Sequence, residues 1–428
     1  MSNNRYNNNE INRENNNNNI SVQNPQQNNF KISNNFYNQR FTSMQLNSNF
    51  NNKNNDVIQS ENNINIINDN NKENTGATMS SSHPNLTQYQ NDTTSFSTDS
   101  FSLLYLTLKC LANINYLSTS LLAQENYQKI YSDKNKYQLT RAYVEVINNF
   151  ENNNLIFYLQ NFKSIIHQMN PSLFEKNESN PKNLILYIIN VIHLDLNASQ
   201  NNTQFIQTQI PSQYDLKSTF DYYSRSFFEN YNSTISNNFC GFSNLKVKCT
   251  NCQFISNKIQ FYNNLTFCLD EVYSFKNNNN NIVNILECFE FFQKKESIGC
   301  KLCNNCHYNL NNNSQKKLIT SPNVLIINLE RKGMQSFIKL KYYESLDISD
   351  YIYSKNSQSP AYYELIGIIS YCETQNENKH YFSFCKSFKD NTWYKHNNNT
   401  THSSSFQEAS NEGNPYILIY QKSIKIFR

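Results

Sequence analysis

The chain is 428 residues long and carries a formal net charge of +4, with only 16% charged residues. No run of Lys and Arg is long enough to indicate nucleic-acid binding, and the most apolar stretch, residues 184–192, is too short to span a bilayer. We therefore expect neither nucleic acid nor membrane among the partners. The polar N-terminus lacks a secretory signal. Together with C-x-x-C pairs among the 11 cysteines, this favours a reducing compartment, the cytoplasm or the nucleus.

Residues 1–95 are dominated by Asn, and their apolar side chains are isolated. Such a segment cannot bury enough apolar surface to offset the entropy lost on ordering. We expect a disordered arm there, followed by one large globular unit over residues 96–428.

Three helices are predicted in the first half of this unit. Residues 102–117 are apolar on almost every side, as in a buried helix, and the Ser, Thr and Asp residues at 97–100 are good N-caps. Residues 136–150 form an amphipathic pattern. A third helix begins after Asn180, a suitable N-cap, with Pro181 at its first position.

Short strands rich in β-branched and aromatic residues are predicted after about residue 238. They are residues 244–249, 259–269, 323–331, 362–371, 380–386 and 415–422. A helix-rich half followed by a strand-rich half predicts an α+β fold with two lobes.

Two C-x-x-C pairs are separated by 50 residues: Cys249 with Cys252, and Cys303 with Cys306. Two thiolates at this spacing bind one edge of a tetrahedral Zn²⁺, and a second pair completes the site. We expect one structural zinc per chain, with Cys300 and His307 available as substitute ligands. The cysteines expected to be small buried apolar residues are Cys110, Cys268, Cys288, Cys372 and Cys385.

Four short pieces follow one another near the C-terminus: His380-Tyr381, Trp393-Tyr394, Asn397-Asn398 and Tyr416-Ile-Leu-Ile-Tyr420. In this order they resemble the histidine box of the ubiquitin-specific proteases, a family of papain-like deubiquitinases. Upstream, "NVLIINLER" (residues 323–331, after Pro322) resembles a strand of the same family. The two C-x-x-C pairs fall where its finger zinc site lies, and residues 180–197 resemble its acidic-residue box.

The resemblance covers about residues 97–424 and implies a papain-like cysteine protease fold. That fold has a helical thumb (about 97–215), zinc-containing β fingers (about 238–320) and a β-sheet palm (about 321–424). It also implies a monomer whose partner is ubiquitin or a ubiquitylated protein.

By the same resemblance, His380 is the catalytic base and Asn398 is the residue that orients its imidazole. The base takes the proton of the nucleophile, and the third residue holds the correct tautomer. The Gly that precedes the histidine in the family is Lys379 here, a long cation where the substrate tail would pass. Asn180 and Asn183 stand where the acidic box has Asp and Glu.

The nucleophile of the family's cysteine box is missing. The segment "TLKCLANINYL" (residues 107–117) matches the later part of that box without gaps, which makes Cys110 its second, structural cysteine and places Ser102 at the nucleophile position. Ser97 then falls on the oxyanion-donor Asn and Asp99 on the flexible Gly. A rival register places Asn115 at the nucleophile and matches the rest of the helix worse; neither register supplies a cysteine.

A serine hydroxyl is far harder to deprotonate than a thiol at a helix N-terminus, and losing one oxyanion donor alone costs about 2.7–4 kcal/mol of transition-state stabilisation. We therefore interpret the chain as a catalytically impaired ubiquitin-specific protease domain that keeps the fold and binds ubiquitin. The alternatives are an active isopeptidase, through Ser102 or a misplaced cysteine, and a zinc-containing interaction module unrelated to ubiquitin.

Overall fold

A computed structural model describes most of the chain after residue 97. The described residues are 98–175, 179–199, 215–276, 281–296, 303, 305–307, 314–332, 338–353, 361–373, 379–397 and 400–423. The predicted arm over residues 1–95 lies outside them.

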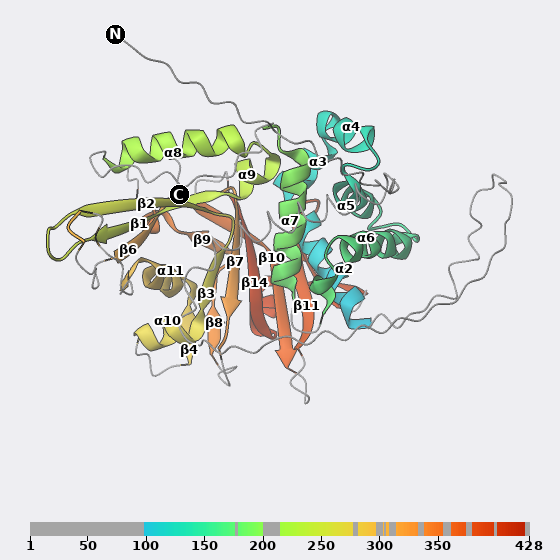
Figure 1. The fold of residues 1–428 in the computed structure, drawn as a ribbon. Coiled ribbons are helices and arrows are strands. Elements are labelled where there is room, and N and C mark those ends of the chain that lie inside the picture. Colours follow the sequence, from blue (N-terminus) through green and yellow to red (C-terminus); the bar gives the residue numbers. More distant parts are fainter. Residues whose placement is uncertain are drawn as a thin grey trace, which may run out of the picture.

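An eight-stranded sheet, called the main sheet below, lies at the centre of the described residues. Its strand order is β13 (Thr400–Ser404), β12 (Trp393–Asn397), β11 (Lys379–Lys386), β10 (Tyr362–Glu373), β14 (Asn414–Lys422), β7 (Val324–Glu330) and β3 (Leu265–Cys268), with β9 (Ser345–Asp347) also pairing with β10. Neighbouring strands are antiparallel except β3 and β7, which are parallel. Figure 1 shows this sheet between two sets of helices.

Successive side chains of the central strands point to opposite faces of the main sheet, and both faces are apolar. Ile417 and Ile419 pack under the helices that precede the sheet in the chain, whereas Leu418 and Tyr420 pack on the opposite face. The first face is covered by the helical lobe: α2 (Thr98–Ala112), α3 (Asn115–Leu122), α4 (Gln124–Ser132), α5 (Gln138–Asn148), α6 (Leu155–Met169), the 3₁₀ turn η2 (Pro171–Phe174) and α7 (Pro181–Leu196). The second face meets α10 (Leu269–Lys276), α11 (Ile285–Gln293) and α12 (Phe406–Asn411), near the short strands β4 (Ile282–Asn284) and β8 (Lys339–Lys341) and the 3₁₀ turn η3 (Ser349–Tyr351).

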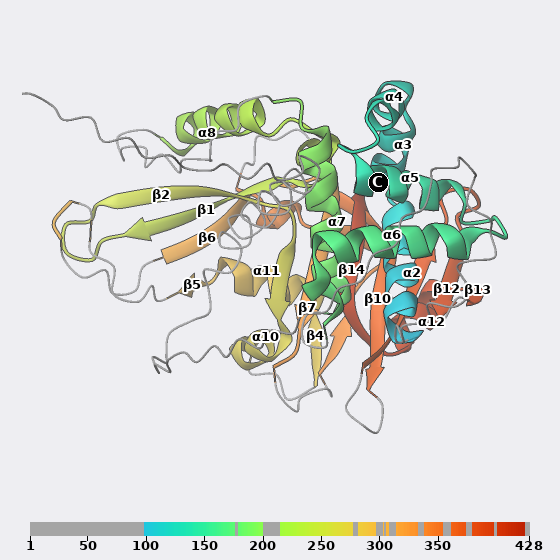
Figure 2. The same ribbon diagram turned by 45° about the vertical axis from the view of Figure 1, so that its right-hand side comes forward.

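A smaller sheet, called the finger sheet below, projects from the main sheet (Figures 1 and 2). Its order is β2 (Ile255–Tyr262), β1 (Gly241–Lys248), β6 (Ser314–Thr320) and β5 (Lys295–Glu296). It follows α8 (Leu216–Asn230) and α9 (Thr234–Phe239) in the chain. Helix α8 packs on the finger sheet through its own aromatic cluster, in which Tyr223 and Phe227 meet Phe242.

The predicted elements occur, with two corrections. The helix predicted over residues 102–117 is two helices, because the chain breaks at Asn113, whose side-chain amide donates to the carbonyls of Ile366 and Lys386 on the main sheet. The strand predicted over residues 259–269 is also two, β2 and β3, which belong to different sheets.

The start of α7 agrees with its prediction. The Asn180 side chain accepts a hydrogen bond from the backbone N–H of Asn183 (2.9 Å), and Pro181 is the first helical residue. Among the described residues, no helix is both long and apolar enough to cross a membrane.

Candidate active site and cysteine cluster

Helix α2 of the helical lobe packs on strand β11 and runs in the same direction. Its last residues lie beside the end of β11, where Asn113 donates to the Lys386 carbonyl (2.5 Å). One turn earlier, the Cys110 sulfur lies 3.4 Å from the Cys385 sulfur. Earlier still, Tyr105 approaches the β12–β13 hairpin, with its hydroxyl 3.3 Å from Oγ1 of Thr401.

Because the two elements run side by side in the same direction, the first residues of α2 lie near the first residues of β11. Ser102 precedes Asn113 by eleven residues, about 16 Å along a helix. His380 precedes Lys386 by six residues, about 20 Å along a strand. Ser102, which is half-buried, and His380 therefore belong to the same end of the packed helix–strand pair.

His380 has an asparagine partner on the neighbouring strand. Its Nε2 lies 2.9 Å from Oδ1 of Asn397, the last residue of β12. In the tautomer with its proton on Nε2, the ring N–H would donate to this amide oxygen and Nδ1 would be the acceptor nitrogen. An asparagine can thus orient the imidazole and fix its tautomer, although it supplies no negative charge.

The predicted partner, Asn398, lies outside the described residues, as does Ser97. The contact with Asn397 was not anticipated from the sequence. The doublet Asn397-Asn398 was its only signal, and the doublet does not say which residue faces the ring. The catalytic roles of Ser102, His380 and Asn398 remain predictions.

The rival position for the nucleophile is at the other end of the main sheet. The backbone N–H of Asn115 donates to the Gln421 side chain near the end of β14. Strand β14 begins at Asn414, opposite Tyr371, which is also the cross-strand partner of Tyr381 next to His380. Gln421 follows Asn414 by seven positions, which span about 23 Å of strand, so the geometry favours Ser102 over Asn115.

Cys110 and Cys385 form a buried thiol pair. The hydrogen bond with Cys110 and the nearby His396 imidazole lower the pKa of Cys385, while burial raises the pKa of Cys110. Nevertheless, the two residues are only 1% and 4% exposed, so a protein substrate cannot reach their sulfur atoms. The pair is part of the packing between α2 and β11, in agreement with the structural role predicted for Cys110.

The four C-x-x-C cysteines converge at the outer end of the finger sheet. Their sulfur atoms all lie within 4.8 Å of one another. The sulfur of Cys249 lies 3.7 Å from that of Cys306, and the sulfur of Cys252 lies 3.7 Å from that of Cys303. Each pair occupies a similar turn, closed by a residue with positive φ: Gln253 (60°) after the first pair and His307 (55°) after the second.

This cluster has the chemistry that a metal ion requires. The N–H of Gln253 donates to the Cys249 carbonyl and that of His307 to the Cys303 carbonyl, so that both turns hold their sulfurs on one side. A hydrogen bond from Asn305 lowers the pKa of Cys252, whereas the pKa of its neighbour Cys249 is raised. Four sulfur donors at this spacing fit a closed tetrahedral ion.

The proposed substitute ligands are not part of this set. His307 occupies a turn position outside the four-sulfur cluster, and Cys300 lies outside the described residues. Of the cysteines expected to be buried, Cys372 is exposed because it lies near the end of β10, beyond the cover of the helices; the other four are buried.

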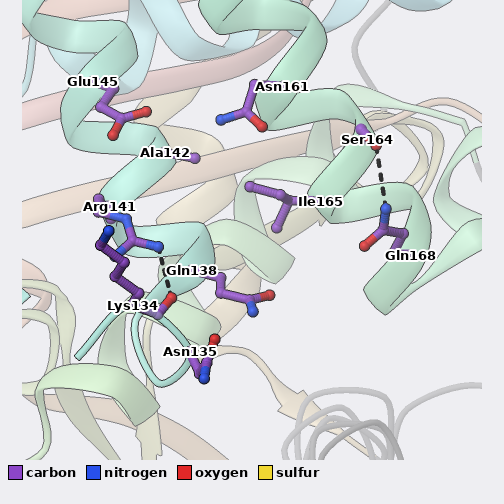
Figure 3. A pocket seen from close by; sticks show the side chains of 10 residues that line it. All are labelled: Lys134, Asn135, Gln138, Arg141, Ala142, Glu145, Asn161, Ser164, Ile165 and Gln168. Atoms are coloured by element: carbon purple, nitrogen blue, oxygen red, sulfur yellow. Dashed lines mark hydrogen bonds between the residues drawn. The ribbon is translucent and has the colours of Figure 1, made fainter. Parts of the chain in front are cut away.

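A polar hollow of about 470 Å³ lies between α5 and α6, as Figure 3 shows. Its lining includes Arg141, Glu145 and Asn161, and Arg141 donates to the Lys134 carbonyl across one side. None of the predicted site residues lines this hollow, so it is separate from the candidate active site.

Comparison with known proteins agrees with this geometry. The family model described as ubiquitin carboxyl-terminal hydrolase matches residues 101–420. The chain is 26% identical over 196 residues to the probable ubiquitin carboxyl-terminal hydrolase 16 of Schizosaccharomyces pombe, covering 44% of this chain and 40% of the relative. It is 31% identical over 158 residues to ubiquitin carboxyl-terminal hydrolase 8 of Saccharomyces cerevisiae, covering 32% of each. The matches thus span less than half of either relative.

Solved structures show the same fold. A SAGA DUB module of Ubp8, Sgf11, Sus1 and Sgf73 bound to monoubiquitin matches with a TM-score of 0.55 and 21% identity, over 76% of this chain and 67% of that chain. A yeast SAGA DUB module structure matches with the same TM-score and 20% identity, over 76% and 67%. The α+β, papain-like architecture expected from the sequence is therefore confirmed. With its fold and about three quarters of its length matched, the chain belongs to the ubiquitin carboxyl-terminal hydrolase family.

Proposed function

We propose that this chain is a ubiquitin-binding member of its family with strongly impaired hydrolysis, and that its cysteine cluster holds a structural zinc ion. The observation that carries this proposal is that an oriented histidine and a serine occur together at the end of the packed pair where α2 and β11 begin. The imidazole of His380 is still oriented by an asparagine, while the helix position facing that end carries Ser102 in place of a thiol.

The chemistry explains why this combination reduces the rate. A cysteine near a helix N-terminus ionises close to neutral pH, whereas a serine needs a base and an oxyanion hole in good alignment. The partner of His380 is a neutral amide, so it does not stabilise the imidazolium that forms when the base takes a proton. Non-covalent binding of ubiquitin does not require the nucleophile, because no bond is formed or broken.

Restoring the thiol tests the assignment directly. We expect Ser102→Cys to react with ubiquitin that carries a C-terminal electrophile and the wild-type chain to remain unmodified. Adding His380→Ala to Ser102→Cys is expected to slow the labelling. Asn115→Cys is the matched control, because it places a thiol at the rival position. Labelling of Asn115→Cys but not of Ser102→Cys would overturn the register.

Two further measurements separate the alternatives. Turnover of a fluorogenic ubiquitin substrate by the wild-type chain, abolished by His380→Ala, would show an active isopeptidase. Calorimetric titration with ubiquitin tests binding, and no detectable binding would favour an interaction module unrelated to ubiquitin. The relatives are named as ubiquitin carboxyl-terminal hydrolases and one matched structure contains monoubiquitin, which supports ubiquitin as the partner.

A further inference from the structure

Cys110 and Cys385 bring two thiols together at the contact between α2 and β11. Their sulfur atoms lie 3.4 Å apart, which is about 1.4 Å farther than in a disulfide bond. Gly367 of β10 is the cross-strand partner of Cys385 and has no side chain. A Cβ added to Gly367 would lie 3.8 Å from the Cys110 sulfur. The glycine therefore leaves the space above this pair of strands to the two thiols.

The surroundings of the pair favour a thiolate at Cys385. The hydrogen bond with Cys110 lowers the pKa of Cys385 against the effect of burial, and the His396 imidazole and the Lys109 ammonium act in the same direction. Burial raises the pKa of Cys110. The pair thus combines a thiolate, which is the nucleophile, with an adjacent thiol that can react with an oxidised sulfur.

Cys385 is close to an edge of the main sheet that can open. It lies one strand in from the outer hairpin of β12 and β13, and its cross-strand partner is Tyr394. Four of the five residues of β13 are exposed. The hairpin is held by Oγ1 of Thr401, which lies 2.9 Å from His396 Nδ1 and 3.3 Å from the Tyr105 hydroxyl. Edge elements with few buried contacts open locally at low free-energy cost, and opening here uncovers Cys385 to an oxidant as small as hydrogen peroxide.

We propose that Cys110 and Cys385 are a peroxide-sensitive thiol pair that closes to a reversible disulfide between α2 and β11. The bond joins the helix that carries Ser102 to the strand that carries His380. The thiol pair is independent of the proposed function, because its oxidation requires neither ubiquitin nor the candidate active site.

The oxidation takes two balanced steps. The Cys385 thiolate attacks one oxygen of hydrogen peroxide, the O–O bond breaks, and the departing hydroxide takes up the proton that the thiol released and becomes water. Cys385 is then a sulfenic acid, oxidised by two electrons. The Cys110 sulfur next attacks the Cys385 sulfur, so that the S–S bond forms, the S–O bond breaks, and the hydroxyl leaves with the Cys110 proton as a second water. A small thiol such as glutathione reverses the bond by exchange.

Peptide mapping of the full chain tests the proposal. The zinc-supplemented protein is treated with hydrogen peroxide until the exposed Cys372 is oxidised, free thiols are alkylated in denaturant, and the chain is digested without reductant. We expect a cross-linked pair of peptides that contains Cys110 and Cys385, lighter than its two parts by two hydrogen atoms and absent after dithiothreitol. Cys288 is the internal control, because it is equally buried but donates to the Asn284 carbonyl, and it should remain free for alkylation.

Two variants test the resolving thiol and the entry route. Cys110→Ser keeps the size of the side chain, so peroxide should leave Cys385 as a sulfenic acid that dimedone traps. Thr401→Ala removes the hydroxyl that holds the outer hairpin and should raise the rate of disulfide formation about fivefold, the effect of one lost hydrogen bond on the opening equilibrium. Ser403→Ala is the matched control, because it changes an exposed hydroxyl of the same strand, and it should react at the wild-type rate.

Three results of the mapping would overturn the proposal. They are two thiols that stay reduced, a Cys385 that is oxidised while Cys110 stays free, and a disulfide from either residue to the metal cluster. Equal rates in Thr401→Ala and the wild type would refute entry through the outer hairpin. None of these readouts uses ubiquitin or turnover, so a failure of the proposed function would leave the result for the thiol pair unchanged.

Discussion

Removing the metal that we propose at the cysteine cluster should loosen the finger sheet and leave the main sheet intact. The cluster joins the turn ending at Cys252 to the turn beginning at Cys303, and so closes a loop of 50 intervening residues. By the chain-entropy relation for cross-links, closing a loop of this size destabilises the unfolded state by about 4 kcal/mol at 25 °C. This value is an upper limit for opening of the finger sheet alone, because β3, α10 and α11 lie within the loop and stay folded on the main sheet.

The effect should be local, because the finger sheet has its own aromatic cluster, separate from the two cores of the main sheet. If the free energy of opening the finger sheet falls by about 4 kcal/mol, the equilibrium constant for opening rises about a thousandfold. In the Cys303→Ser protein, or after chelation, amides of β1, β2 and β6 should exchange up to that much faster. Amides of β7 and β10 should keep their protection.

Hydrogen exchange followed by mass spectrometry measures the amide protection of both sheets in one experiment. Separately, metal analysis should find about one zinc per chain before chelation. Cys372→Ser is the control, because it removes an exposed thiol outside the cluster. Finger-sheet exchange that does not change when the metal is lost would refute the argument, as would a purified chain that carries no metal.

Three further substitutions test individual contacts by equilibrium or thermal unfolding. Asn180→Ala removes the helix cap of α7 and should cost about 1 kcal/mol, whereas Asn183→Ala keeps the backbone donor and should not lose the cap. Gly413→Ala should cost about 1–3 kcal/mol, because φ is +70° and a Cβ would lie 2.6 Å from the Phe382 ring; an unchanged unfolding temperature would refute this. Burial lowers the pKa of Lys163 to about 8, so its charged form destabilises the fold below pH 8. Lys163→Met should then raise stability at pH 7 by on the order of 1–2 kcal/mol after allowance for solvent screening, and this gain should shrink as the pH rises from 8 toward about 10.5.

Local patterns were enough to predict where most elements lie. Cap chemistry at Asn180 and Pro181 places the start of α7, and continuous apolar runs locate the central strands β7, β10 and β14. These features depend on neighbouring residues alone, so the sequence contains the information needed to predict them.

The predictions that the structure corrects all depend on contacts between segments that are distant in the sequence. Asn113 breaks the helix because two carbonyls on β10 and β11, more than 250 residues away, accept its amide protons. Similarly, the split between β2 and β3 follows Asn264, which accepts a hydrogen bond from Asn328 on β7. Such partners cannot be read from local periodicity. The one-residue choice between Asn397 and Asn398 is of the same kind, since only the register of β11 against β12 and the local twist decide which amide reaches His380.

The position of the cysteine cluster also has a mechanical consequence. Strand β1 of the finger sheet begins at Gly241 and reaches the cluster after Lys248, about 26 Å away. A cross-link at the outer end of the finger sheet restricts twisting of its strands against one another. A cross-link at the base, next to the main sheet, would restrict this twisting far less. When a bound protein pushes on the tip, the finger sheet should therefore move as one rigid body and transmit the force to the main sheet. Without the cross-link, the same force would only bend the β1–β2 hairpin.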